Sequence, residues 1–381
     1  MQIIGILAFV VALLFSVMVH EFGHYLTARH YGMKVSEFFL GFGKRLWSTQ
    51  RGETEFGIKA IPAGGYCRIE GMAPNDQMPV GEEGRAFYKA SSGKKLIVLG
   101  AGSFLHFVLG YLLLFTLFAG VGTNQVLPVI GEVVASSAAQ DAGIQVGDEV
   151  TSINGVPVKN WYKDVEAIRN SQGRELTLGI NREGQELTIT ATPRLTEVEG
   201  TKRYVLGIVN TIGMKRSGVL QSASYSFTAT KSFITQSAKS LVSLPSKIPA
   251  LWGQTVRGEE RDANGLVGVV GVARVSGEAV GNAQLTIPER VATFILIVAS
   301  LNIFVGIFNL LPILPLDGGH MAVAIADEVR ALFARLRGRP RPAAIDVTVL
   351  TPVTMVVFVI LACLTLLLLV ADVINPVTLN L

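Results

Sequence analysis

Residues 18–27 read VMVHEFGHYL and place two histidines and a glutamate directly after a run of apolar side chains. His20, Glu21 and His24 have the spacing H-E-x-x-H. On a helix, residues four positions apart share one face, so both imidazoles can bind the same Zn²⁺ ion. Glu21 then lies beside the water that the ion activates and can take its proton as the water attacks a carbonyl. The motif predicts a zinc hydrolase.

A catalytic zinc site needs a third protein ligand and leaves a fourth position for water. Asp317 follows the third long apolar segment, in the stretch NLLPILPLDGGH (309–320). The prolines and glycines of that stretch predict a broken helix, which is tolerated at membrane depth only where the backbone lines a protein cavity. The rival ligand is His106, which lies about ten residues into the second apolar segment and so about 15 Å from its edge. We favour Asp317 and keep His106 as the alternative.

Further polar residues accompany the predicted site. Asn309, beside the helix break, can hydrogen-bond the substrate backbone or the developing oxyanion, or else a neighbouring helix. Asn302 carries less weight. His320 is either a partner of a metal ligand or an interfacial residue, and His30 is interpreted as an ordinary residue at headgroup level.

The composition is that of a membrane protein, because 50% of the residues are hydrophobic and 16% charged, against about 25% charged in soluble domains. A membrane-spanning helix needs about 20 apolar residues. The first such segment lacks a basic start and a small-residue cleavage site, so it is predicted to be retained rather than removed as a signal peptide. The sequence holds four candidate segments: one up to Val19, and three over Leu96–Gly122, Val291–Leu316 and Val347–Ala371.

Lysine and arginine counts orient these spans. The segment 34–95 holds ten of them, and 330–341 holds five arginines and no acidic residue. Both segments are therefore predicted to be cytoplasmic, with both termini and the large segment between the second and third spans outside. No basic stripe or nucleic-acid-binding motif is present, which argues against a nucleic-acid partner. Cys67 and Cys363 lie in different environments and predict no disulfide.

The segments between the spans have their own patterns. Residues 37–71 alternate apolar and polar side chains between glycine-rich turns and predict β-hairpins, either dipping into the membrane interface or forming a small cytoplasmic sheet. Residues 129–193 predict a compact α+β module with one helix near Trp161–Asn170. Residues 215–250 have loosely helical spacing. Residues 265–284 are glycine-rich, too interrupted to span, and are interpreted as a re-entrant or docking loop.

The predicted organisation divides the chain into nine parts. They are the first span with the H-E-x-x-H motif (1–33), a cytoplasmic or re-entrant β loop (34–95), the second span (96–122), the external module (126–210), an external amphipathic helix with the glycine-rich loop (211–288), the third span with Leu-Asp-Gly (289–333), a basic cytoplasmic loop (334–346), the fourth span (347–372) and an external tail (373–381).

The order of these motifs resembles one family. HEFGH in the first span, GFG (41–43) in the loop, a strand-rich external module, GLVGVVGVARVSG and NLLPILPLDGG follow one another as in the site-2 proteases, which are multi-pass intramembrane zinc metalloproteases. The chain is most similar to bacterial members of the RseP type, in a layout with a single PDZ domain. The resemblance covers nearly the whole chain.

The resemblance implies a polytopic α-helical membrane protein with four transmembrane helices, a re-entrant β-hairpin and an extracytoplasmic α+β PDZ domain. It implies Zn²⁺ held by His20, His24 and Asp317, Glu21 as the general base and Asn309 as a residue that holds substrate. It also implies a bacterial plasma (inner) membrane, with the active site near the cytoplasmic face. The implied substrates are single-span proteins such as anti-sigma factors already cut outside, and remnant signal peptides.

The chain departs from the family pattern at Ser103 and His106, where proline and asparagine are usual, and at Leu266, where proline is common. Two other classes of function are weighed against a protease of membrane segments. A membrane-anchored PDZ scaffold without catalysis is expected to lose Glu21 first, and here Glu21 is present. A membrane zinc protease for soluble peptides is expected to carry its third ligand on a cytoplasmic helix, and no suitable residue follows the motif.

Overall fold

The computed structural model describes residues 1–381 apart from 74–75, 199, 263–264 and 378–381, so the end of the predicted tail lies outside the described residues. The chain folds into two compact units. The first comprises Met1–Gly120 with Ser217–Leu381, and the second comprises Val121–Arg216. The first unit carries the H-E-x-x-H motif and all the long apolar helices.

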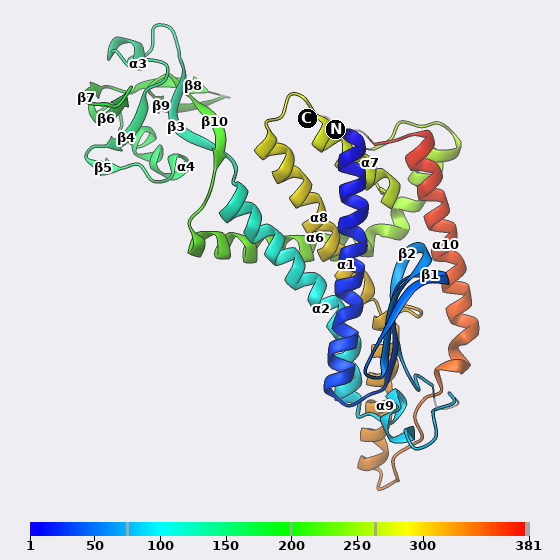
Figure 1. Ribbon diagram of the computed structural model, residues 1–381. Coiled ribbons are helices and arrows are strands. Elements are labelled where there is room, and N and C mark those ends of the chain that lie inside the picture. The colour runs from blue at the N-terminus through cyan, green and yellow to red at the C-terminus, as the bar shows by residue number, and fades with distance from the viewer. Residues whose placement is uncertain (74–75, 199, 263–264, 378–381) are drawn as a thin grey trace. The chain divides into compact units, whose positions relative to one another are not determined.

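Four helices in the described part of the chain are long and apolar enough to cross a membrane, as predicted. Helix α1 contacts α2, and α2 contacts α8, whereas α10 contacts α6 and α7 (Figure 1). The four candidate spans are α1 (Gln2–His30), α2 (Ser92–Thr116, extended by a π-helical turn at Leu117–Val121), α8 (Ile287–Asn309) and α10 (Thr351–Ile374, after a 3-10 turn at Val347–Leu350).

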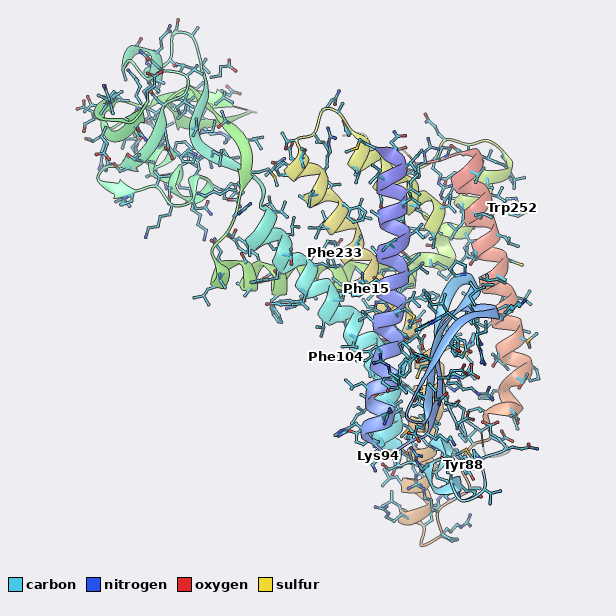
Figure 2. The ribbon with its side chains drawn as sticks, in the orientation of Figure 1. Phe15, Tyr88, Lys94, Phe104, Phe233 and Trp252 are labelled. Carbon is cyan, nitrogen blue, oxygen red and sulfur yellow. The ribbon has the colours of Figure 1, made fainter. Side chains whose placement is uncertain are left out.

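Large apolar side chains point away from the protein along these helices. Phe15 on α1 and Phe104 on α2 are 58% and 62% exposed (Figure 2). A soluble protein rarely exposes apolar surface on this scale, whereas a hydrocarbon environment accepts it. The outward faces therefore support a position inside a bilayer.

The predicted β region forms a sheet of β1 (Val35–Arg51) and β2 (Thr54–Ile69), both long and folded back on themselves. Residues 37–40 pair with 65–68 on one side and with 55–58 on the other, and 55–58 also pair with 47–50. The order of the paired segments is thus 65–68, 37–40, 55–58, 47–50, so 65–68 forms one edge. Two short 3-10 turns, Glu83–Arg85 and Phe87–Lys89, lead from this sheet to α2. Entry of the sheet into the membrane stays a prediction.

The helix expected at 215–250 is confirmed as α6 (Val219–Val256). The loop expected at 265–284 is wrong over most of its length, because α7 occupies Val269–Gly281. Its glycines allow close packing on α1: a Cβ at Gly277 would lie 2.9 Å from the Gln2 carbonyl oxygen, and one at Gly5 would lie 2.8 Å from that of Ser276. Tertiary packing here outweighs the low helix propensity of glycine.

The third span is shorter than predicted. Helix α8 ends at Asn309 rather than continuing to Leu316, and α9 (Asp317–Leu336) is a separate helix, so the predicted part 289–333 contains two helices. The predicted break therefore lies at 310–316. A Cβ at Gly318 would lie 2.3 Å from backbone atoms of Leu310 and Leu311, so only glycine lets the start of α9 pack on this connection.

The second unit has the α+β composition expected from the sequence. Its sheet has the order β10-β3-β4-β6-β7, with β5 paired to β4, and a separate hairpin pairs β8 with β9. Ile130, Leu178 and Ile180 are fully buried in its core. Identification as a PDZ domain stays a prediction. The strands are β3 (Thr123–Val133), β4 (Glu149–Ile153), β5 (Val156–Pro157), β6 (Leu176–Arg182), β7 (Gln185–Ala191), β8 (Arg194–Val198), β9 (Thr201–Val205) and β10 (Ile208–Lys215), with short helices α3 (Ala138–Asp141), α4 (Trp161–Asp164) and α5 (Glu166–Arg169).

Candidate metal centre

Helix α1 carries both motif histidines to the contact with α2. His20 and His24 are each 7% exposed. A Cβ at Gly23 would lie 2.7 Å from the Ala101 carbonyl oxygen, and one at Gly102 would lie 2.7 Å from His24 Nε2. These two glycines let the helix backbones approach closely, as small residues do between membrane helices. The histidines are thus buried between two spans.

Asp317, the first residue of α9, completes a cluster with the two imidazoles. Its Oδ2 lies 3.1 Å from His20 Nε2 and 3.3 Å from His24 Nε2, and the two Nε2 atoms are 3.0 Å apart. Zinc bonds of about 2.0–2.1 Å in tetrahedral geometry separate neighbouring ligand atoms by about 3.3 Å. Among the described residues, this is the group whose ligand atoms are close enough to hold a metal ion.

The polar atoms of the cluster fit a cation better than they fit one another. Asp317 Oδ2 is buried and has no hydrogen-bond partner with suitable geometry in the described structure, although two ring nitrogens lie close to it. His24 Nδ1 lies 2.8 Å from the Val98 carbonyl oxygen, to which it donates when Nε2 serves as a metal ligand. Two imidazole nitrogens and a carboxylate oxygen are ligands that zinc takes.

Glu21 lies beside the edge segment 65–68 of the sheet. A Cβ at Gly65 would lie 3.4 Å from Glu21 Cγ and 2.9 Å from Met18 Sδ, so this strand packs directly against the turn of α1 that carries the glutamate. The backbone N–H of Cys67 faces the Glu21 carboxylate. Glu21, the base expected from the motif, therefore projects from α1 toward the edge strand of the sheet.

The other candidate residues lie in different surroundings. Asn309 is the last residue of α8 and half-buried, and its side chain makes no hydrogen bond among the described residues. His320 is half-buried on α9, and His30 is exposed at the end of α1, in keeping with a headgroup-level position. His106, the rival ligand, is not part of the three-residue group.

Asn302, to which little weight was assigned on sequence grounds, is 1% exposed and bonded to His106. His106 Nδ1 lies 2.9 Å from Asn302 Oδ1, and the two residues are 196 positions apart in the chain. The spacing of Asn302 and Asn309, about two helical turns, places both on one side of α8 and was the available signal. No sequence pattern could identify the Val98 carbonyl as the partner of His24, because it is a backbone group. Both cysteines are free, as predicted.

Comparison with known proteins is consistent with this geometry. The family model described as peptidase family M50 matches residues 8–360. Zinc metalloprotease Rip1 of Mycobacterium tuberculosis (strain ATCC 25618 / H37Rv) is 33% identical, over 100% of this chain and 99% of that protein. Its namesake in Mycolicibacterium smegmatis is 34% identical over 98% of both chains. A putative zinc metalloprotease of Helicobacter pylori is 32% identical over 82% of this chain and 87% of its own length.

Proposed function

We propose that this chain, which belongs to peptidase family M50 and is a zinc metalloprotease, cleaves peptide bonds within transmembrane segments of single-span proteins. The resemblance to the site-2 proteases is confirmed at the level of the family. The observation that carries the proposal is the convergence of His20, His24 and Asp317 inside a bundle of membrane-spanning helices, with Glu21 beside them.

In this proposal the three clustered residues hold the zinc ion, which supplies Lewis-acid activation of water and of the scissile carbonyl. Glu21 accepts the proton of the attacking water and passes it to the leaving amide nitrogen. This role of Glu21 is supported by its position next to His20 in the chain and by its packing against segment 65–68. Asn309, at the end of α8, donates its amide N–H to the substrate backbone.

A helical substrate must unwind before it is cut, because its own hydrogen bonds and side chains shield the peptide bond. The edge segment 65–68 of the sheet is suited to hold the unwound stretch by β-augmentation, since it pairs with residues 37–40 on one side only and runs past Glu21. Glycine or proline in the substrate lowers the cost of unwinding.

The second unit supplies a binding site for substrate ectodomains in this proposal. It contains a cleft of about 700 Å³ with apolar and basic walls. An extended peptide with an acidic or carboxylate end suits that lining. The lining includes Trp161, Ile168, Arg169, Arg194, Leu206 and Ile208. We assign this unit as the PDZ domain and place it outside a bacterial inner membrane, with the basic loops inside.

The substrates proposed are anti-sigma-factor-type proteins that a first protease has shortened outside, together with remnant signal peptides. The test uses the purified full-length protein and a reporter transmembrane segment. Glu21→Gln is expected to retain zinc and to slow cleavage about 10²–10⁴-fold, because only the proton acceptor is lost.

Glu186→Gln, at an exposed position of β7, is the matched control and should cleave at the wild-type rate. Zinc per protein is measured on the same samples. Wild-type cleavage by Glu21→Gln would contradict the assignment of the base, and absence of zinc from the wild-type protein would contradict the metal centre.

A further inference from the structure

His20 has a buried ring nitrogen that the proposed zinc site leaves unexplained. Its Nε2 faces Asp317, whereas its Nδ1 is buried without a hydrogen-bond partner in the described part of the chain. The corresponding atom of His24 has the Val98 carbonyl as its acceptor. A metal-binding histidine normally donates its second N–H to an acceptor, which fixes the tautomer and the ring orientation. His20 needs an equivalent acceptor.

The ring of His106, on α2, lies close to the ring of His20. The two ring centroids are 5.0 Å apart, with 42° between the ring planes. Two imidazoles joined by a hydrogen bond of about 2.9 Å have centroids about 5 Å apart, because each nitrogen lies about 1.1 Å from its ring centre. Gly102, one turn before His106, borders the Nδ1 edge of His20, since a Cβ there would lie 2.7 Å from His20 Nδ1. Helix α2 thus leaves space for the bond and supplies a ring beside it.

Asn302 determines which nitrogen of His106 can accept. The amide nitrogen of Asn302 donates to the Val298 carbonyl at 2.8 Å, so the amide oxygen is the atom that faces His106. His106 Nδ1 therefore donates to Asn302 Oδ1. In a neutral imidazole the other nitrogen, Nε2, then carries a lone pair and accepts. His106 is held in the tautomer that His20 Nδ1–H requires.

We infer that His106 is a positioning residue that accepts a hydrogen bond from His20 Nδ1–H in the zinc-loaded protein, with Asn302 fixing its tautomer. The inference rests on the proposed role of His20 as a zinc ligand. The chain of bonds joins α8, α2 and α1, so the packing of three spans sets the direction of one ligand. Loss of such an outer partner typically lowers metal affinity about 10–100-fold.

The test measures zinc affinity of full-length variants by competition with a chromogenic chelator, and the visible absorption of the Co²⁺-substituted protein. His106→Leu keeps an apolar side chain and removes the acceptor, and it is expected to weaken zinc binding about 10–100-fold with the three-ligand Co²⁺ spectrum retained. His106→Gln, which offers an amide oxygen, should recover most of the affinity. Asn302→Leu should weaken binding like His106→Leu, and the double variant should lose no more than either, because the residues act in series.

Ser103→Ala is the control for packing of the same helix, since Ser103 is fully buried three residues before His106. It should bind zinc as the wild type does. Unchanged zinc affinity in His106→Leu would overturn the inference, as would a Co²⁺ spectrum showing that a ligand has been lost, which would make His106 a ligand itself. Equal loss of affinity in Ser103→Ala would also overturn it. Failure of the proposed function is recognised separately, because the wild-type protein itself would then bind no zinc or leave the reporter transmembrane segment uncut.

Discussion

Asp317 and Asp372 are carboxylates of the first unit whose surroundings differ. Asp372, near the end of α10, is 2% exposed and engages both oxygens: Oδ1 accepts from Arg261 Nη2 at 3.1 Å, and Oδ2 accepts from the Gly271 backbone N–H at 2.8 Å. Asp317 Oδ2 faces two imidazole nitrogens and has no hydrogen-bond partner in the described structure. A carboxylate whose bonds are complete holds a fold together, whereas one that converges with two imidazole nitrogens is arranged for a cation.

The glycine-rich sequence around α7 belongs to the Asp372 arrangement. A Cβ at Gly268 would lie 2.6 Å from Asp372 Oδ2, and one at Gly271 would lie 2.9 Å from its Cγ. Glycine at both positions lets the start of α7 pack closely on the carboxylate. Asn375, which directly follows α10, donates to the Glu259 carbonyl at 2.9 Å. These contacts join α10 to the connection between α6 and α7.

The largest effect on zinc binding and cleavage is expected from substitution of Asp317. Asp317→Asn should lose both zinc and cleavage, because a neutral amide is a poor zinc ligand. The metal-free protein should unfold at the same temperature as metal-free wild type, since no structural bond is removed. Chelation should lower the unfolding temperature of the wild type and leave that of the variant unchanged, because only the wild type gains stability from binding.

Metal analysis, reporter cleavage and thermal unfolding in detergent check these outcomes together. Bound zinc in Asp317→Asn with loss of zinc in His106→Asn would instead make His106 the third ligand.

Asp372 should show the reverse pattern. Asp372→Leu is expected to keep zinc at the wild-type ratio and to lower the free energy of unfolding by about 3–5 kcal/mol, because it leaves the buried Arg261 guanidinium without its counter-charge. Arg261 is 4% exposed at its side chain, so water cannot replace the carboxylate. Denaturant titration of the full-length protein measures the change.

The double variant Asp372→Leu with Arg261→Met is the matched control and should recover much of the lost stability, since an apolar pair can replace a buried ion pair. Zinc loss in Asp372→Leu under native conditions would contradict the assignment of a purely structural role to Asp372.

The smallest effect concerns Asp148 in the second unit, which like Asp372 is a buried carboxylate with complete bonds. It accepts from Arg182 at 2.7 and 2.8 Å and from the Gln145 backbone N–H at 2.9 Å. The bond with Arg182 holds the pKa of Asp148 below its usual value. Its stabilising contribution is therefore complete above the unfolded-state pKa of about 3.9 and is lost as the pH falls through the lower folded-state pKa.

Residues 121–216 form a compact unit whose ends are paired, Thr123 with Lys215, so the unit can be studied alone. Asp148→Asn should destabilise it by about 1–2 kcal/mol at pH 7, because Arg182 stays partly exposed. The difference from the wild type should shrink below about pH 4. Thermal unfolding as a function of pH measures this, and a difference that grows on acidification would contradict the assigned pKa direction.

Local patterns predicted much of this molecule correctly. The four candidate spans and the helix α6 followed from apolar composition and periodicity, which depend on neighbouring residues alone. The predictions that were wrong, the loop at 269–281 and the continuation of the third span beyond Asn309, concern segments whose conformation depends on contacts with other helices. Glycine content alone favours a loop at 269–281. In the folded protein this segment is helical, because its glycines allow close packing on α1 and on Asp372.

The sequence by itself determined that His20 and His24 share one face with Glu21 beside them, because helix geometry fixes neighbours four residues apart. Only the tertiary structure decided that Asp317 meets both imidazoles and that Asn302 pairs with His106, because these contacts join different helices. Their distances depend on how closely glycine-lined helices pack, and that packing is a property of the whole bundle.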